Sequence, residues 1–321
     1  MGVAENIRRR RLELNMSQQE LAQAIGYRSR STIAKIESGE NSVPEIKYTR
    51  FARALHTTVA YLKTGTAGGA SGEHILRSGE GMPTKNAVIV LAGGDAADNT
   101  QNIPNQFINV LGKPVIIYCL EAYERHPAID DIYIVCLRDW EGIITAYAQQ
   151  YGITKLREVI FSGNTGILSL RNGIESIKDR YGGDDIVIIQ ESTRPLVTEE
   201  DISKLLNACH RNGSAVTCEP MKEYVQFELD KEDIDSSRSC EYLDRERIVS
   251  VQSPEAYRLG TVLEVFASAD SGSHVYNESC FAMLLYHMGY RLQFHEGNCY
   301  NIKIVRQEDM TILGALLRER Y

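Results

Sequence analysis

Short apolar runs rich in valine and isoleucine alternate with segments of helical periodicity from residue 87 onward. Strands are predicted at 87–91, 132–137, 158–161, 185–189 and 215–218, and helices at 115–125, 140–151, 166–178 and 199–212. Strands that are apolar along their whole length and separated by helices are typical of a parallel sheet covered on both faces. The predicted fold class of this part is therefore α/β, a doubly wound, mainly parallel, Rossmann-like sheet with ligand sites at the carboxyl ends of its strands.

The charge of the 321-residue chain is unevenly distributed. Residues 1–66 contain eleven of the 35 basic and six of the 43 acidic side chains, so the remainder contains 24 basic and 37 acidic ones. A basic head on an acidic body indicates two domains with different partners. Between them, residues 64–82 contain six glycines and little apolar content. We predict a small all-α domain at 1–65, a flexible glycine-rich linker at 66–84 and the α/β domain at 85–321.

Composition excludes several classes of protein. No apolar run approaches the ~20 residues that cross a bilayer. The N-terminus has no apolar stretch after its basic cluster, so we expect a cytoplasmic protein without a membrane partner. The seven cysteines are dispersed without a C-x-x-C pair, which is typical of reduced thiols. The seven histidines show no ligand spacing, so no structural transition-metal site is expected, and nothing indicates an organic cofactor.

The head contains the local signals of two short helices joined by a turn. Residues 17–20 (SQQE) have the S-x-x-E spacing of a capping box, which begins a helix, and Gly26 is placed to end it. A second helix is expected from Ser29 or Ser31 to Gly39, with small polar and basic side chains outward. This arrangement predicts a helix-turn-helix.

The stretch MSQQELAQAIGYRSRSTIAKIESGENSVPEIKYTRFARALHTTVAYL resembles the Cro/C1 (XRE) family of helix-turn-helix domains, and the resemblance covers residues 1–63. It implies that DNA is a partner. The implied contacts are, in the major groove, Arg30, Ser31, Ala34 and Lys35 and, at phosphates, Gln18, Arg28, Thr32 and Asn41. An extra residue in the turn leaves the register of the recognition helix open by one position. The alternative is a five-helix module used only for dimerisation or peptide contact, in which residues 8–11 form a solvated face.

The first predicted strand of the body runs into a small-residue turn, LAGGDAADNTQNIPNQF at 91–107. A strand that enters a glycine turn usually binds phosphate, because backbone N–H groups converge there and a following Lys or Arg neutralises the anion. This loop carries Asp95 and Asp98 and contains no Lys or Arg. It has the shape expected of a phosphate loop without the charge.

The body resembles the IspD/TarI family of cytidylyltransferases over about residues 86–317. Enzymes of this family join CTP to a polyol or methylerythritol phosphate and release pyrophosphate. The motifs that carry the resemblance are, in family order, residues 104–107, 111–114, Gly163 with Ser169, 172–173, 191–195, 244–245, 253–254, 277–278 and 301–304. Their order and spacing together, rather than any one motif, identify the body as a member of this family.

The resemblance also implies the residues of a site. For the nucleotide they are Ala92, Gly93, Gly94, Gly163 and Ser169; for the substrate phosphate, Arg245 and Ser253; and for catalysis, Lys303 near the reacting centre with Arg194 as support. Glu191 replaces the family aspartate that holds Mg²⁺, so Mg²⁺ is the implied cofactor, on a carboxylate one methylene longer. The implied ligands are a CTP-like nucleotide or a sugar or polyol phosphate.

The chain departs from the family where the triphosphate would lie. The family's loop arginine is Asp98 here, its P-K-Q lysine is Asn105, and an arginine of the later glycine loop is Gly166. Nucleotidyl transfer depends on positive charge around the α-phosphate and the leaving pyrophosphate, and losing one such donor costs about 10²–10³ in rate. We therefore interpret the protein as a transcriptional regulator whose body has kept the binding architecture and lost fast catalysis.

Two alternatives stay open. In one, the body is a working CTP-dependent transferase with an appended DNA-binding domain, and Lys113, Arg171 or a basic residue of a partner subunit enters the loop. In the other, Arg194 and Lys303 form ordinary surface pairs and the body binds no nucleotide.

The segment 222–241 is acidic and irregular. Here the family has an arm that pairs two subunits, so a homodimer is expected, which would suit a helix-turn-helix protein on a two-fold operator. The sequence of the arm departs from the family's, so this expectation rests on the fold alone.

Overall fold

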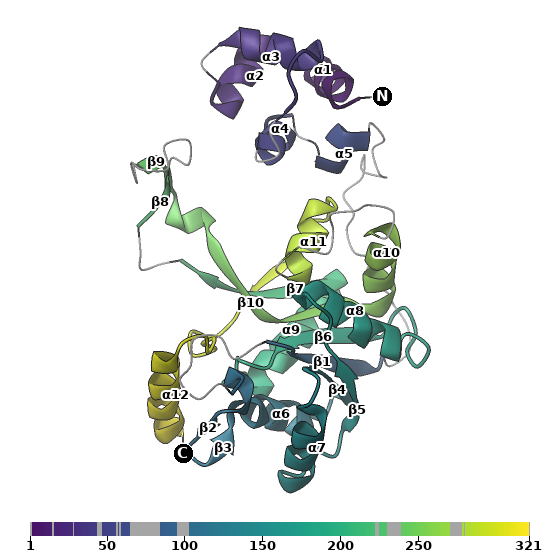
Figure 1. Cartoon of the computed structure of the whole chain (residues 1–321), viewed down its shortest axis with the longest axis vertical. Coiled ribbons are helices and arrows are strands. Elements are labelled where there is room, and N and C mark those ends of the chain that lie inside the picture. Colours follow the sequence, from purple (N-terminus) through teal and green to yellow (C-terminus); the bar gives the residue numbers. More distant parts are fainter. Residues whose placement is uncertain are drawn as a thin grey trace. The chain divides into compact units, whose positions relative to one another are not determined.

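The computed structural model describes residues 2–14, 16–27, 29–43, 47–55, 57, 59–64, 84–94, 103–221, 225–229, 239–269, 278 and 280–320. Over these residues the chain forms two compact units, a helical one that contains the first five helices and an α/β one that contains the sheet (Figure 1).

The helical unit comprises α1 (Val3–Glu13), α2 (Gln18–Ile25), α3 (Arg30–Glu37), α4 (Tyr48–Ala54) and α5 (Val59–Thr64). The predicted capping box is confirmed, because Ser17 accepts a hydrogen bond from the backbone of Glu20 and the Glu20 carboxylate accepts one from the backbone of Ser17. Gly26 ends α2 in the left-handed region at φ 86°, and Ser29 caps α3. The predicted helix-turn-helix is therefore formed.

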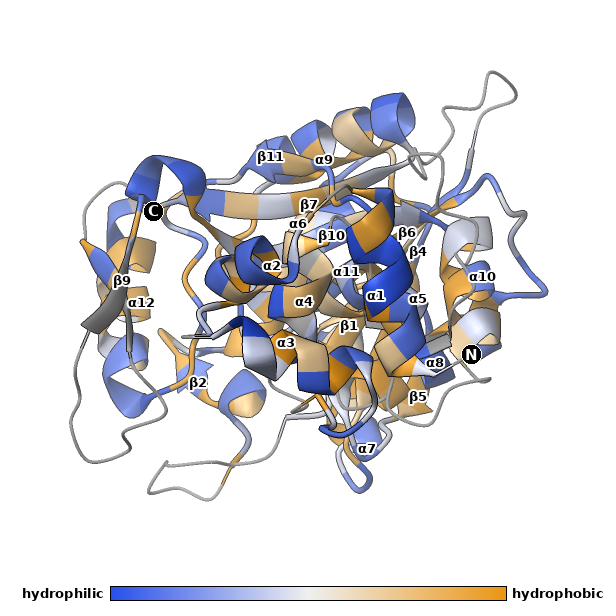
Figure 2. Cartoon of the chain, turned by 90° about the horizontal axis from the view of Figure 1, so that it is seen from above, coloured by the Kyte–Doolittle hydropathy of each residue, from blue (hydrophilic) through white to orange (hydrophobic). Residues whose placement is uncertain are grey.

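Each of these helices contributes an apolar side chain to one small core. Ile7, Leu21, Ile33, Phe51 and Leu62 are all fully buried. The opposite faces are polar, and Figure 2 shows α1 as largely hydrophilic. Short amphipathic helices of this kind are stabilised mainly by packing against one another rather than by their own propensity.

The run of four arginines in α1 is not a solvated face throughout, so this part of the alternative is wrong for Arg11. Arg11 is 7% exposed, and its guanidinium donates from Nε and Nη2 to the two carboxylate oxygens of Glu37 in α3, at 2.6 and 2.9 Å. A third donor, Nη1, reaches the carbonyl of Met16 at 2.6 Å. This bidentate pair joins the first helix to the second helix of the helix-turn-helix.

The rest of the chain forms, in order, β1 (Asn86–Ala92), η2 (Asn105–Phe107), β2 (Asn109–Val110), β3 (Lys113–Pro114), α6 (Val115–Arg125), β4 (Asp131–Cys136), α7 (Glu141–Gln150), β5 (Leu156–Phe161), α8 (Gly166–Ile177), β6 (Ile186–Glu191), α9 (Glu199–Asn212), β7 (Ser214–Pro220), β8 (Gln226–Leu229), β9 (Ser239–Leu243), η3 (Arg245–Arg247), β10 (Val249–Arg258), α10 (Leu259–Ala269), α11 (Phe281–His287), β11 (Phe294–Glu296) and α12 (Gln307–Arg320). Every strand and helix predicted between 87 and 218 is present, with its ends shifted by at most two residues.

Seven strands form one sheet in the order β11-β7-β10-β6-β1-β4-β5. β1 pairs in parallel with β4 and β6, β4 pairs in parallel with β5, and β11 pairs in parallel with β7. The mainly parallel, doubly wound sheet is confirmed. The antiparallel strand β10 between β6 and β7 was not predicted, because a proline in the middle of its sequence argues against a central strand. The carboxyl ends of β1, β4, β5 and β6 share one edge of the sheet.

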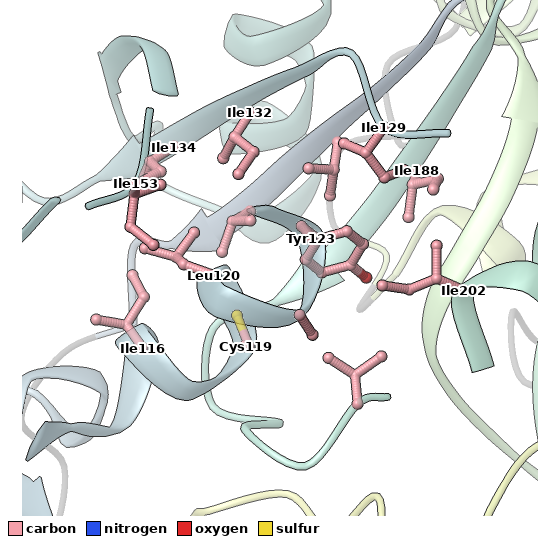
Figure 3. Close-up of a cluster of buried hydrophobic side chains, with 14 of the residues drawn as sticks. Ile116, Cys119, Leu120, Tyr123, Ile129, Ile132, Ile134, Ile153, Ile188 and Ile202 are labelled. Carbon is pink, nitrogen blue, oxygen red and sulfur yellow. The ribbon is translucent and has the colours of Figure 1, made fainter. Parts of the chain in front are cut away.

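Figure 3 shows the apolar layer between α6 and the sheet. Leu120 and Tyr123 of α6 lie with Ile132 and Ile134 of β4, and all four are buried. The Tyr123 hydroxyl donates to the Gln190 side chain at 2.7 Å, so the one polar end in this layer is satisfied.

On the opposite face, Gly173 lets α8 lie close to the sheet. A Cβ at this position would stand 2.9 Å from the Ile89 side chain, which is closer than real Cβ atoms come, and 3.1 Å from the Val135 side chain, which is a tight contact. The glycine of this motif is therefore required by packing.

The segment predicted to be irregular contains a β-hairpin, which corrects that expectation. β8 and β9 pair antiparallel, and the rings of Phe227 and Tyr242 lie 5.9 Å apart across the pair, each more than half exposed. Residues 222–224 and 230–238 of this segment lie outside the described residues.

Two further observations bear on the classes that composition excludes. None of the helices in the described part of the chain is long and apolar enough to cross a membrane. Cys119, Cys136, Cys209 and Cys218 are buried free thiols, and Cys299 is an exposed free thiol.

Candidate functional site

The loops that follow β1 and β5 meet at the carboxyl edge of the sheet. Gly93 comes directly after β1, and a Cβ there would stand 2.7 Å from the Ser162 Cβ and 3.5 Å from the Ser169 hydroxyl. Only glycine allows the two loops to approach this closely. Ala92, at the end of β1, is fully buried, and Gly94 follows at the open side of the turn. The structure thus brings the predicted nucleotide residues of the two loops together.

Ser169 closes the second of these loops. Its hydroxyl is buried, accepts a hydrogen bond from the Gly163 backbone at 3.1 Å and donates to the Thr165 carbonyl at 2.9 Å. A Cβ at Gly163 would stand 2.5 Å from that of Leu168, so this glycine is also fixed by sterics. These contacts give the two residues a structural role, and their assigned role in binding the base stays a prediction.

The far end of the loop after β1 is tied to the protein by two amides. The Gln106 side chain donates to the carbonyls of Ala92 and Gly94, both at 3.0 Å. Asn105, at the position where the resemblance places a lysine, is 9% exposed and donates to the carbonyl of Val305 at 2.9 Å. Residues 95–102, with both loop aspartates, lie outside the described residues.

Lys113, one candidate to enter that loop, is engaged elsewhere. Its ammonium lies 2.6 Å from the Glu121 carboxylate and 4.9 Å from the centre of the Tyr118 ring. The structure therefore gives no support to Lys113 as the missing cation.

A cluster of three charged side chains lies at the end of β6. Arg194 donates from Nε to one carboxylate oxygen of Glu191 at 2.8 Å, and Lys303 pairs with the other oxygen. Burial opposes ionisation of Glu191, but Lys303 and Arg194 together outweigh it and hold the pKa of the carboxyl below its ordinary value. The cluster therefore contains one carboxylate and two cations.

Hydrogen bonds from β10 and from Asn301 hold this cluster in place. The register of β10 shifts between Gln252 and Glu255, and the residues in the shift include Ser253, whose hydroxyl accepts from the Glu191 backbone at 3.0 Å. The Asn301 amide donates to the Ser253 carbonyl at 2.7 Å, and the Asn301 carbonyl accepts from Arg194 Nη1 at 2.7 Å. Asn301 is 3% exposed, so it is a buried junction for three segments.

A second carboxyl beneath the cluster was missed at the level of sequence. Glu255 of β10 is 4% exposed and accepts from the Tyr257 hydroxyl at 2.8 Å. Burial raises the pKa of Glu255 to about 7, and the nearby negative charge of Glu191 acts in the same direction. The sequence gives little signal for this residue, because Glu255 directly follows a proline and lies in a run of six consecutive buried residues of β10 rather than in an alternating pattern.

The structure thus places Glu191, Arg194, Ser253 and Lys303 together. Arg245, the other residue predicted to bind the substrate phosphate, is exposed in η3, between β9 and β10, whereas Ser253 is buried.

The donor set argues against a preformed Mg²⁺ site. Among the described residues, no group of three or more His, Cys, Asp or Glu side chains could hold a metal ion. Glu191 is a single carboxylate, and both of its oxygens already contact cations. Mg²⁺ requires six oxygens in octahedral array, so these residues do not fit the ion by themselves.

The helical unit displays most of the predicted DNA contacts on α3. Arg30, Ser31 and Lys35 are exposed, and Thr32 and Ala34 are half-buried. Asn41 is exposed beyond the helix, while Gln18 donates its amide to Glu37 at 3.0 Å. Arg28 lies outside the described residues.

Comparison with known proteins decides the family. The family model of 2-C-methyl-D-erythritol 4-phosphate cytidylyltransferase, IspD, matches residues 86–319. The chain belongs to the IspD family. A helix-turn-helix model matches residues 7–62, so this IspD-family chain also carries a helix-turn-helix domain.

Its relatives within the IspD family include enzymes for two different alcohols. The ribitol-5-phosphate cytidylyltransferase of Lacticaseibacillus paracasei is 33% identical over 233 residues, which cover 72% of this chain and 97% of that protein. The 2-C-methyl-D-erythritol 4-phosphate cytidylyltransferase of Syntrophus aciditrophicus is 29% identical over 239 residues, 74% of this chain and 98% of that protein.

A solved structure shows the same fold. The 4-diphosphocytidyl-2C-methyl-D-erythritol synthase of Anaerococcus prevotii superposes with a TM-score of 0.63 at 21% identity, over 74% of this chain and 97% of that one. At this identity the likeness establishes the IspD fold alone.

Proposed function

We propose that this IspD-family chain is a DNA-binding transcriptional regulator whose body binds a nucleotide or a sugar or polyol phosphate and transfers cytidylyl groups slowly or not at all. The observation that carries the proposal is the hydrogen bond that Asn105 makes within the protein. Where the resemblance places a lysine, this chain has a buried amide that bonds to the Val305 carbonyl. It supplies no charge to a triphosphate.

The two cations at the end of β6 support the same conclusion. Lys303 and Arg194 both pair with Glu191. Fast nucleotidyl transfer needs donors preorganised toward charge that develops in the transition state, and a donor held by an internal carboxylate is not preorganised for that purpose.

The candidate ligands follow from the relatives and from the edge of the sheet where the loops meet. In the proposal, a CTP-like base lies against Gly93 and the loop closed by Ser169, and a polyol phosphate such as ribitol 5-phosphate lies toward Ser253 and Arg245. Mg²⁺, if it is used, would reach Glu191 only together with ligand oxygens.

A homodimer completes the proposal. The β8–β9 hairpin exposes Phe227 and Tyr242, and aromatic side chains are enriched in protein interfaces. A two-fold dimer would present two copies of α3 to a palindromic operator.

The catalytic part of the proposal is tested by following pyrophosphate. Protein incubated with CTP, Mg²⁺ and ribitol 5-phosphate should release pyrophosphate at least about 10²-fold more slowly than the ~1 s⁻¹ that marks the low end of ordinary enzymes, because loop cations are missing. Turnover near that ordinary rate would establish the runner-up, a working transferase with an appended DNA-binding domain.

The DNA-binding part is tested by salt titration on duplex DNA. Lys35→Ala and Arg30→Ala should each weaken binding and reduce the slope of log affinity against log salt by about one, because each removes one exposed cation from α3. Lys204→Ala, which removes an exposed cation from α9 in the body, is the matched control. If the α3 variants bind like the control, the head is a dimerisation or peptide-contact module.

A further inference from the structure

The helix α3, the second helix of the helix-turn-helix, has a first turn that its cap fixes. Ser29 stands before the helix in an extended conformation, and its hydroxyl accepts a hydrogen bond from the Ser31 backbone at 3.1 Å. Arg30 is therefore the first residue of α3. In helix-turn-helix complexes, the N-terminal residues of this helix are the ones that contact base edges in the major groove.

The side chains at this end of α3 differ in what they can still offer a ligand. Arg30 is exposed, and within the described part of the chain its guanidinium has no hydrogen-bond or ion-pair partner. Ser31 is exposed as well, but its hydroxyl already shares a hydrogen bond of 2.8 Å with the Ser29 hydroxyl. Arg30 is thus the long polar side chain of the first turn, and it carries donors only.

The rest of α3 lacks the side chains that read adenine or cytosine. Its sequence, RSTIAKIE, contains no Asn or Gln, the residues that pair with adenine. Cytosine presents a donor and needs an acidic side chain, but the single acid of α3, Glu37, is buried and bonded twice to Arg11. Apart from its hydroxyl groups, the helix therefore offers a base only donors.

Guanine is the base that matches such a surface. It presents two acceptors, N7 and O6, to the major groove, and the fork of a guanidinium can donate to both at once. A phosphate can also accept from Arg30, but phosphate contacts are made without regard to sequence. The two roles are separated by whether the identity of one base pair changes the affinity.

We infer that Arg30 reads a guanine, so that the DNA this protein binds most tightly has a G·C pair at the position that faces Arg30, and that α3 makes no bidentate contact to adenine. The inference rests on the DNA-binding part of the proposed function and names the base that the head recognises. A bidentate pair of this kind discriminates against a wrong base by about tenfold to a hundredfold.

The test is selection from a pool of random duplex DNA by the full chain and by its Arg30→Gln variant, at one salt concentration because DNA affinity depends steeply on salt. Glutamine pairs with adenine instead of guanine. We expect the parent motif to contain a guanine that becomes adenine in the variant motif, with the other positions unchanged. Arg8→Gln is the matched control, since it removes an exposed arginine from α1, and it should enrich the parent motif.

A second measurement uses the selected duplex. 7-Deazaguanine at the position assigned to Arg30 replaces the N7 acceptor by a C–H group and keeps the base pair. It should weaken binding of the parent about threefold to tenfold, because one of two hydrogen bonds is lost. The affinity of Arg30→Gln should be the same for the duplexes with guanine and with 7-deazaguanine.

Three outcomes overturn the inference alone: one motif shared by the parent and Arg30→Gln, a parent motif without guanine at the position that changes, or equal affinities of the parent for guanine and 7-deazaguanine. A full chain that binds no duplex DNA overturns the inference together with the DNA-binding part of the proposed function.

Discussion

Replacing Arg11 by methionine is expected to lower the free energy of unfolding of the helical unit by about 3–5 kcal/mol. Arg11 and Glu37 are less than a tenth exposed and share two hydrogen bonds, so the variant leaves a buried carboxylate without its counter-charge. Hydrogen–deuterium exchange of α1, α2 and α3 in the full chain measures the effect. Protection should fall by about 10²–10⁴, because 1.4 kcal/mol is tenfold.

Two further variants separate the loss of a partner from the loss of an ion pair in general. Arg11→Met combined with Glu37→Leu removes both charges and should recover most of the stability, because a buried pair replaced by apolar side chains is often neutral. Glu13→Gln breaks only the exposed pair with Arg10 and should cost less than about 1 kcal/mol. Equal losses of stability in Arg11→Met and Glu13→Gln would show that the buried pair contributes no more to the free energy of unfolding than the exposed pair.

Restoring charge to the loop after β1 should recover affinity for CTP and part of the missing rate. The double variant Asp98→Arg/Asn105→Lys replaces an acid and an amide by the two cations of the family. Each recovered donor is worth about 10²–10³ in rate, although the two effects need not add. The lysine must give up the Asn105 bond to Val305, which costs about 1 kcal/mol, and can extend its ammonium into the loop.

Titration with CTP and pyrophosphate release under the same conditions measure the gain. Asp98→Asn is the control, since it removes the negative charge without adding a positive one, and Asp98→Arg alone reports the arginine without disturbing Asn105. A double variant that binds CTP no better than the parent would mean that the loop is not a vacated triphosphate site.

Local features of this protein could be predicted well because their causes are local. The capping box at Ser17 and the left-handed Gly26 depend on atoms within one helical turn, and both are present in the structure. The bounds of α6 and α9 were predicted to the residue, because the hydrophobic period and flanking residues specify them. The strand β10 was not predicted, and the reason is also local. The proline in its middle conflicts with the rule that proline is not found in central strands.

The hydrogen-bond and ion-pair partners of the charged and polar side chains could not be predicted in this way. Arg11 is the last of four consecutive arginines, and only the packing of α1 on α3 gives it Glu37 as a partner, 26 positions away. Asn105 meets Val305 across 200 positions, and Lys303 meets Glu191 across 112. A residue in a motif can therefore carry the family's identity while its functional atoms are already bonded elsewhere.

The sequence by itself determined that a helix-turn-helix precedes a doubly wound α/β sheet, because residue types, spacing and hydrophobic period are properties of the linear chain. The resemblance to the IspD family added the expectation that two cations of its phosphate loop are replaced in this chain. The tertiary structure alone decided that Glu191 faces both Arg194 and Lys303 and that Asn105 is turned toward Val305. Electrostatic and hydrogen-bond partners depend on distances between segments remote in the chain, and only the folded packing sets those distances.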